Sequence, residues 1–251
     1  MLKPYGGDWF TAQTALRTWY ATALGAELHA RIASRIEVFL RDIYALHCLQ
    51  LGGTQQGVDL LDGRALVHRV HVTGDGAEGM RAEPSFLPLA TRSTDLVLLC
   101  HVLEFSDDPH ALLREVDRVL ALDGHVLVVG FNPWSLFGLR RLLGSAGVPW
   151  SGRFYSPRRV EDWCRLLGLR TCRHETLWLR PPLQHAAVRR RTAGVERLQR
   201  LLPGAGAIYL TLARKRSVPF TPLPASRERE TVPAGRAVRP TQRGELQWRR
   251  R

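Results

Sequence analysis

The sequence predicts an α/β domain whose sheet is mostly parallel, with helices on both faces and an antiparallel last strand. Strand-like apolar runs alternate with amphipathic helical patterns over about 150 residues, which favours helical crossovers between parallel strands. The run DLVLLCHVL at 95–103 is apolar almost throughout, as a strand covered on both faces should be. The segment AIYLTLARKR at 207–216 alternates like a final antiparallel strand.

The N-terminal part predicts two helices, a strand and a tight turn. Apolar residues recur at helical spacing over residues 9–42, and the Leu-Gly pair at 24–25 is the expected break between the helices. The apolar run at 44–51 predicts a buried strand, and the glycines at 52–53 suit a tight turn after it. Ligands bind at this edge of a parallel sheet.

The second strand is expected soon after the first. A weaker helical pattern covers residues 56–62, and ALVHRVHV at 65–72 alternates like a strand. The span from Gly52 to Leu87 is short, so we expect the helix after the second strand to be reduced or missing.

Helix signals are clearest after residue 107. Asp108 is the expected N-cap and Pro109 the first helical residue, with a stop at the Asp-Gly pair 123–124. A strand at 125–131 then leads to a loop at Asn132 and an apolar-basic stretch that reaches Gly144. The apolar stripe of the helix consists of Leu112, Leu113, Val116, Val119 and Leu120.

The C-terminal third predicts one more helix on the sheet. Ser156 and Pro157 begin it, Val160, Trp163, Cys164 and Leu167 face inward, and Gly168 ends it. A strand at 169–179 and a cationic helix at 185–202 precede the last strand. We therefore expect one domain over residues 1–222, with helices at 1–43, and a tail over 223–251.

The charge is concentrated at the C-terminal end. The formal net charge is +13, and the segment from Arg214 to Arg251 holds 11 Lys and Arg against 3 acids. Its Pro, Arg, Ser, Thr and Glu content predicts a basic, disordered tail. Such a charge favours weak, sequence-independent binding of nucleic acid through this tail. The simpler interpretation is that these arginines are solvated.

The cysteine pattern and the hydropathy exclude several classes. Three of the four cysteines lie among apolar residues and none forms a C-x-x-C pair, so we expect neither a zinc site nor a disulfide framework. No apolar stretch is long enough for a membrane-spanning helix. We expect a cytoplasmic protein without a membrane partner and without a metal. The cysteines are Cys48, Cys100, Cys164 and Cys172.

Six short motifs follow one another in order over residues 87–136. They are Leu87-Pro88, Ser93-Thr94-Asp95, the stretch from His101 to Phe105, Leu113-Arg114-Glu115, Arg118-Val119-Leu120 and Asp123-Gly124. In this order they resemble the second half of a class I S-adenosylmethionine-dependent methyltransferase domain of the type 11 group. This resemblance implies a Rossmann-like fold, S-adenosylmethionine as cofactor and an unidentified methyl acceptor as partner.

A narrower resemblance is to a small bacterial subgroup of that family, and it covers about residues 16–222. The matching motifs are LQLG at 49–52, HVLEF at 101–105, DPH at 108–110, GFNPWSLFGLRR at 130–141 and YLTLARKR at 209–216.

The resemblance implies cofactor-binding residues at the strand ends. Gln50 stands where the family has an acid, and the glycine turn is reduced to Gly52 and Gly53. Asp75 is the nearby candidate for the ribose-binding acid after the second strand. Leu87 and His101 complete the expected cofactor site.

Two residues are candidates for the chemistry itself. His101 ends the strand where methyl donor and acceptor meet in the family, so it is either a general base, a residue that shapes the pocket or a hydrogen-bonded strand-end histidine. Asn132 lies in a loop at the ligand edge and either lines the acceptor pocket or forms an Asx turn. Neighbouring Glu104 is a candidate for cofactor or acceptor binding, or for a helix-capping or solvated role.

Methyl transfer is the function that these observations favour. Because the glycine turn is degenerate, a noncatalytic binding protein with the same fold is one alternative. A nucleic-acid-associated protein that uses the arginine-rich tail is the other.

Overall fold

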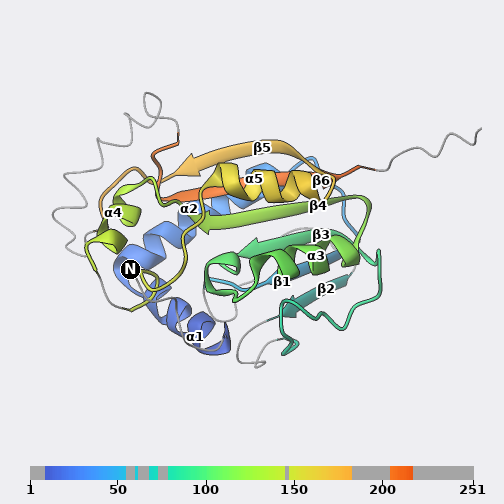
Figure 1. Ribbon diagram of the computed structural model, residues 1–251, viewed down its shortest axis with the longest axis horizontal. Helices are drawn as coiled ribbons and strands as arrows, with labels where there is room; N and C mark the ends of the chain where they lie inside the picture. Colours follow the sequence, from blue (N-terminus) through green and yellow to red (C-terminus); the bar gives the residue numbers. More distant parts are fainter. Residues whose placement is uncertain are drawn as a thin grey trace, which may run out of the picture. The chain divides into compact units, whose positions relative to one another are not determined.

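The fold is a six-stranded sheet with helices on both faces (Figure 1). The computed structural model describes residues 9–54, 60–61, 68–72, 79–144, 147–182 and 204–216. The helices are α1 (Trp9–Tyr20), α2 (Ala23–Leu40), α3 (Pro109–Val119), α4 (Leu136–Leu142) and α5 (Pro157–Leu166), with the 3-10 helix η1 (Leu103–Phe105). The strands are β1 (His47–Leu51), β2 (His68–Val72), β3 (Thr94–Cys100), β4 (Leu120–Phe131), β5 (Leu169–Leu177) and β6 (Ile208–Lys215).

The strand order is β2-β1-β3-β4-β6-β5, and this confirms the predicted fold class. The pairs among β1 to β4 are parallel, whereas β6 is antiparallel to both β4 and β5. The chain leaves β1 toward β2 and then crosses back to β3 on the other side. This reversal of direction is the place where ligands bind in such sheets.

Alternate residues of β3 pack into two separate hydrophobic clusters, one on each face of the sheet. Leu96 and Leu98 join the cluster that α1, α2 and α4 cover. Val97 and Leu99 join the cluster that α3 and α5 cover. The prediction of a strand buried on both faces is therefore confirmed for β3.

The predicted break at Leu24-Gly25 is wrong. Helix α1 ends at Tyr20, and Thr22 caps α2 with a hydroxyl that accepts from the Gly25 amide at 3.2 Å. A Cβ at Gly25 would lie 2.4 Å from the Trp19 carbonyl oxygen. The glycine therefore lets two helices approach closely instead of ending one.

The predicted stop at residues 123–124 is also wrong. Helix α3 begins as expected at the Asp108 cap and ends at Val119. Leu120 already pairs with Thr94 in β4, and the register then shifts, so residues 123–124 lie within this strand. Asp123 has φ +63°, which fits an irregularity rather than a helix end.

Two further elements differ from the sequence expectation. The stretch after Asn132 contains the helix α4, which Ser135 caps by accepting from the Gly138 amide. Helix α5 begins at the Ser156 cap as predicted, but Leu167 is only partly buried.

The described part of the connection from β2 to β3 fits the expectation of a reduced or missing helix. Met80 makes an isolated parallel bridge with Val72, and residues 79–93, the described part of this connection, contain no helix. Several predicted features lie wholly or partly outside the described residues. They are the helix at 56–62, the start of the strand at 65–72, Asp75, the helix at 185–202 and the tail at 223–251.

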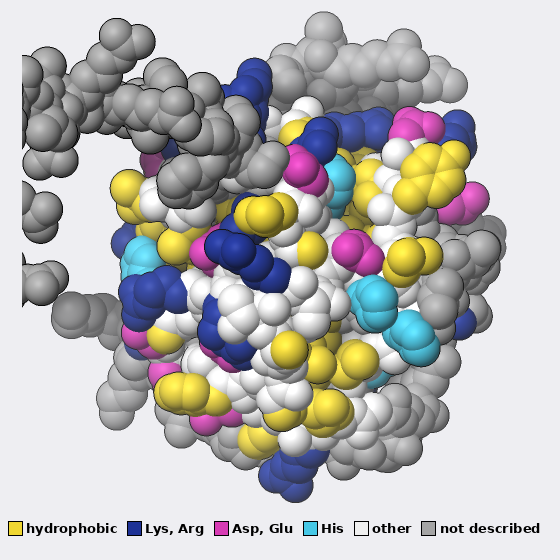
Figure 2. Space-filling view, turned by 90° about the vertical axis from the view of Figure 1, so that its right-hand side faces the viewer, with side chains coloured by type: hydrophobic (Ala, Val, Ile, Leu, Met, Phe, Trp, Pro, Cys, Tyr) yellow, Lys and Arg dark blue, Asp and Glu magenta, His cyan; other side chains and the backbone are white. Residues whose placement is uncertain are grey.

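The amino-terminal end of the sheet looks like ordinary protein surface. Figure 2 faces these strand ends, and hydrophobic, basic and acidic side chains are interspersed on its described part. Cys48, Cys100 and Cys164 are buried, as predicted, and none of the four cysteines forms a disulfide. Within the described ranges, no helix is long and apolar enough to cross a membrane.

Candidate functional site

The turn after β1 requires glycine at Gly52. Its φ is +72°, in the left-handed region that side chains disfavour. A Cβ there would lie 2.5 Å from the carbonyl oxygen of Cys100, at the end of β3. The two central parallel strands therefore approach each other closely at their carboxyl ends, and any side chain at position 52 would clash with backbone.

The side chain of Gln50 stabilises this turn through two hydrogen bonds. Its side chain is buried, Nε2 donates to the Gly52 carbonyl oxygen at 3.1 Å, and Oε1 accepts from the Leu60 amide at 3.2 Å. The amide thus fixes the conformation of the turn with its donor and its acceptor.

The first two helices cover the turn. Gln13 of α1 is fully buried, and its Nε2 donates to the His101 carbonyl oxygen at 3.1 Å. His29 of α2 hydrogen-bonds through Nδ1 with the Thr54 hydroxyl. Burial lowers the pKa of His29, so the imidazole is neutral at neutral pH. Helix α1 therefore contacts the backbone at the end of β3, and α2 contacts the Thr54 side chain after β1.

His101 is fully buried, and both of its ring nitrogens have partners. Nε2 lies 2.7 Å from the Tyr20 hydroxyl, and Nδ1 lies 3.3 Å from Glu104 Oε1. Burial, with smaller effects of Cys100 and Glu104, raises the pKa of Tyr20, so the phenol keeps its proton and donates to Nε2. The ring also stacks on Phe131 at 4.1 Å. This geometry holds the imidazole in one orientation.

Glu104 ties the ends of β3 and β4 together. Its Oε1 accepts from the Phe131 amide at 2.7 Å, and its carbonyl oxygen accepts from the Arg153 amide at 2.8 Å. Glu104 Oε2 is buried and has no hydrogen-bond partner among the described residues. A solvated role for this carboxylate is therefore wrong, because the residue is only 2% exposed.

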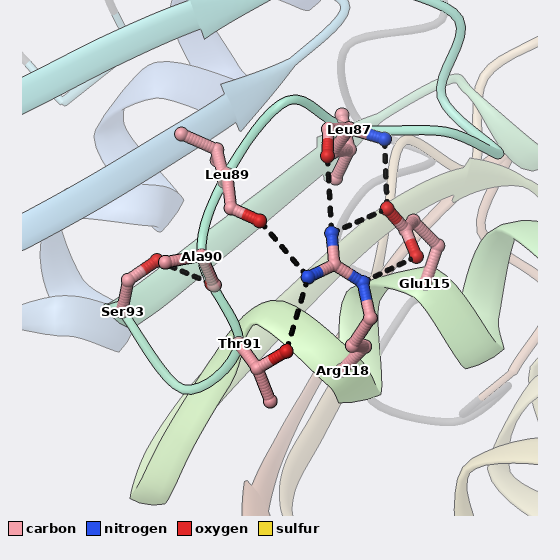
Figure 3. Close-up of polar contacts among 7 residues, drawn as sticks. All are labelled: Leu87, Leu89, Ala90, Thr91, Ser93, Glu115 and Arg118. Carbon is pink, nitrogen blue, oxygen red and sulfur yellow. Dashed lines mark hydrogen bonds and ion pairs between the residues drawn. The ribbon is translucent and has the colours of Figure 1, made fainter.

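Leu87 is held in place from α3. Its amide donates to Glu115 Oε1 at 2.7 Å, and its carbonyl oxygen accepts from Arg118 Nη2 at 3.0 Å (Figure 3). Arg118 also donates to the Leu89 carbonyl oxygen at 2.9 Å. Leu87 packs in the same hydrophobic cluster as Leu51 at the end of β1. Two charged motif residues thus position the loop that precedes β3.

Asn132 anchors the backbone at the end of β4. Its Nδ2 donates to the carbonyl oxygens of Gly204 and Gly206 at 2.7 and 2.9 Å, and its Oδ1 accepts from the Trp134 amide, as an Asx turn requires. It also lines an open groove of about 770 Å³. The other lining residues are Trp134, Ser156, Pro157, Arg158, Glu161, His174, Glu175, Thr176 and Gly204.

The structure brings most of the predicted residues to one edge of the sheet. Gln50, Gly52 and Gly53 lie in one buried turn, and His101 lies beside it at the end of β3. Sequence reasoning missed Gln13 and Tyr20. The available signal was a polar residue on the apolar face that Trp9, Ala12, Leu16 and Tyr20 form on α1.

Comparison with known proteins identifies the family. A model of the methyltransferase domain matches residues 42–128. The uncharacterized protein YafS of Escherichia coli is 31% identical over 206 residues, which cover 81% of this chain and 82% of that protein. The uncharacterized protein Rv2003c of Mycobacterium tuberculosis is 29% identical over 184 residues, 67% of this chain and 62% of that protein.

Solved structures share the fold. The putative methyltransferase in complex with the Trm112 methyltransferase activator of Haloferax volcanii aligns with a TM-score of 0.57 at 15% identity, covering 80% of this chain and 98% of that chain. A possible histamine N-methyltransferase from Thermotoga maritima aligns with a TM-score of 0.54 at 17% identity, covering 83% and 93%. Together with the domain match and the bacterial relative, this fold places the chain in the class I S-adenosylmethionine-dependent methyltransferase family, with a domain of the type 11 group.

Proposed function

We propose that the protein binds S-adenosylmethionine at the Gly52 turn and transfers its methyl group to a polar acceptor held beyond β4. The observation that carries this proposal is the left-handed glycine turn at Gly52, which lies at the carboxyl end of β1 where the strand order reverses. In the proposed site Gln50 and Gly53 shape the turn, Leu87 and His101 flank it, and Asp75 binds the ribose.

The residues present fit the amino-acid part of the cofactor. Gly52 lets the turn pass close to the Cys100 carbonyl oxygen, which any side chain at this position would meet. The buried oxygen Oε1 of Gln13, without a hydrogen-bond partner among the described residues, lies beside the same glycine. A carbonyl-rich turn suits a ligand that carries an ammonium group.

In this proposal the residues of the protein position the methyl donor and the acceptor for the transfer. When bound, S-adenosylmethionine supplies a sulfonium methyl group, which passes to an acceptor lone pair while the electron pair of the carbon–sulfur bond stays on sulfur. His101 orients the end of β3 because both of its ring nitrogens are hydrogen-bonded, so we assign it a positioning role rather than that of a general base.

The groove beside Asn132 is the acceptor site in this proposal. It begins at the end of β4, one strand away from His101, and neighbouring strands lie about 4.8 Å apart. Most of its lining residues are polar or charged, and Trp134 adds an aromatic surface. Burial lowers the pKa of His174, against the effect of Glu161 and Glu175, so a neutral imidazole faces the acceptor at neutral pH.

The subgroup motif at residues 130–141 has structural roles beside the proposed acceptor groove. In the stretch 130–141, Asn132 holds the 204–206 backbone and Ser135 caps α4. A Cβ at Gly138 would lie 1.9 Å from the Pro133 carbonyl oxygen, so this position requires glycine. We propose that this motif marks a subgroup because it builds one wall of the groove.

A matched pair of glycine variants tests the cofactor site. Gly52→Ala and Gly168→Ala both place alanine at a left-handed φ, +72° and +77°, but only Gly52 has backbone near its Cβ. We expect S-adenosylhomocysteine to raise the melting temperature of wild type and Gly168→Ala, and to leave that of a folded Gly52→Ala unchanged. Equal stabilisation of all three proteins would contradict the proposed site.

A noncatalytic binding protein is the second candidate. The environment of Gln50 favours this candidate. The only side-chain oxygen of Gln50 already accepts a hydrogen bond from the Leu60 amide, so Gln50 does not replace the acid that the family has at this position. The discriminating measurement is label transfer from methyl-tritiated S-adenosylmethionine to small molecules of a bacterial extract. Cofactor binding without any transfer favours the noncatalytic candidate, whereas transfer that His174→Ala reduces supports the acceptor groove.

A further inference from the structure

One buried oxygen beside the glycine turn has no donor. Gln13 is fully buried, and its Oε1 makes no hydrogen bond with any described residue. Buried polar atoms in native proteins nearly always have a partner, because losing the hydrogen bonds to water without replacement is costly. An acceptor in this state calls for a donor that arrives with a ligand.

The orientation of the Gln13 amide is set by its other end. Nε2 donates to the His101 carbonyl oxygen at 3.1 Å. A flipped amide would place Oε1 against that carbonyl oxygen, so two acceptors would face each other. Oε1 therefore points toward Gly52, where it lies 3.1 Å from the position of a Cβ.

The residue in the place of the family's acid does not fill this role. Gln50 donates to Gly52 and accepts from Leu60, so its amide is committed to the turn. A Cβ at Gly52 would lie 2.5 Å from the Cys100 carbonyl oxygen and 3.1 Å from Gln13 Oε1. Two oxygens from different elements thus converge on one point beside Gly52.

We propose that Gln13 is a cofactor-binding residue whose Oε1 accepts a hydrogen bond from the α-ammonium group of S-adenosylmethionine. An ammonium has three N–H donors, so it can bond to Gln13 and to backbone carbonyl oxygens together. Hydrogen bonds to charged groups are the stronger ones, and this bond replaces part of what the missing acid would supply. The inference rests on the proposed cofactor site and names a residue from α1, outside the matched domain.

The test crosses one substitution with one change in the ligand. Wild type and Gln13→Met are titrated calorimetrically with S-adenosylhomocysteine and with its analogue in which hydrogen replaces the α-amino group. Methionine keeps the length of the side chain and removes the amide oxygen. We expect wild type to prefer S-adenosylhomocysteine by about tenfold or more, and Gln13→Met to lose most of that preference.

Thr11→Ala is the control, because Thr11 lies on the exposed side of the same helix. It should keep the wild-type preference. If Gln13→Met weakens both ligands equally, or leaves the preference intact, Gln13 only packs on the turn and the proposal is wrong. If circular dichroism shows that Gln13→Met is unfolded, Gln13→Asn, which keeps the amide but withdraws its oxygen, must lose the preference instead.

The outcomes for wild type separate this inference from the proposed function. If wild type binds both ligands equally, the cofactor site stands and the role of Gln13 is overturned. If wild type binds neither ligand at millimolar concentration, the proposed function itself fails and takes the role of Gln13 with it.

Discussion

Arg118 and Glu115 form a bidentate ion pair on α3 that holds the loop before β3. Arg118 Nε and Nη2 donate to the two Glu115 carboxylate oxygens at 2.8 and 2.7 Å (Figure 3). Because Glu115 also accepts from the Leu87 amide, the pair connects the helix to a residue of the proposed cofactor site. The charged motif residues Glu115 and Arg118 therefore have a structural role in holding this loop.

Glu115→Gln should lower stability in a pH-dependent way. Mainly the Arg118 hydrogen bonds, with help from the Leu87 amide, lower the pKa of Glu115. A lowered pKa stabilises the folded state above the unfolded value of about 4.3, and this stability is lost as the pH falls through the folded pKa. We expect the variant to be less stable by roughly 1–2 kcal/mol at pH 7 in urea unfolding, with a smaller difference near pH 3.

Asp162→Asn is the matched control for that measurement. Asp162 pairs with Arg165 at the same helical spacing, but both side chains are more than 60% exposed. Its loss should cost at most about 0.5 kcal/mol. Equal effects of the two substitutions would show that the Glu115 pair behaves as an ordinary surface pair.

Gln50→Glu should destabilise the protein rather than restore a better site. The Gln50 amide donates to the Gly52 carbonyl oxygen, and a carboxylate would face that oxygen without a donor. We expect a loss of about 1–3 kcal/mol in urea unfolding at pH 7. An unchanged or higher stability would show that the turn does not depend on this hydrogen bond.

Local signals in the sequence predicted α3 and α5, whereas tertiary contacts decided the elements that were missed. The Asp108 cap and the Ser156 cap act within one helical turn, so they are readable without the fold. The sequence alone predicts a helix break at Gly25, because the close contact of this glycine with Trp19 arises only after α1 and α2 pack together.

The same distinction applies to the site. Gly52 and His101 were predictable because strand ends and motifs place them. Gln13 was not predictable, because two features of the folded structure give it its role. Its Oε1 has no hydrogen-bond partner among the described residues, and its Nε2 donates to His101, which lies 88 positions away in the sequence.

Thiol reactivity should single out one cysteine. Burial raises the pKa of Cys164 to about 12, with a smaller effect of Glu161, and burial also raises that of Cys100. Cys48 is buried as well, and Cys172 is exposed. We expect a disulfide reagent at pH 8 to titrate one thiol in the native protein and four after unfolding, and Cys172→Ser to abolish the fast phase. Two or more fast thiols in the native protein would contradict the burial of this core.

Removal of the tail should leave the domain intact. The composition after Leu223 offers few apolar groups for packing. A chain truncated after Leu223 should melt within a few degrees of the full chain in a circular dichroism scan. A large, cooperative loss of stability would show that the tail packs on the domain.

The central claim is that the Gly52 turn binds S-adenosylmethionine despite its missing glycines. The most direct test is a calorimetric titration of the full wild-type chain with S-adenosylhomocysteine, the stable reaction product. We predict saturable binding at one site per chain with a dissociation constant below about 1 mM, because the turn and Gln13 remain in place. The absence of binding heat and of any thermal shift at millimolar ligand would contradict the claim.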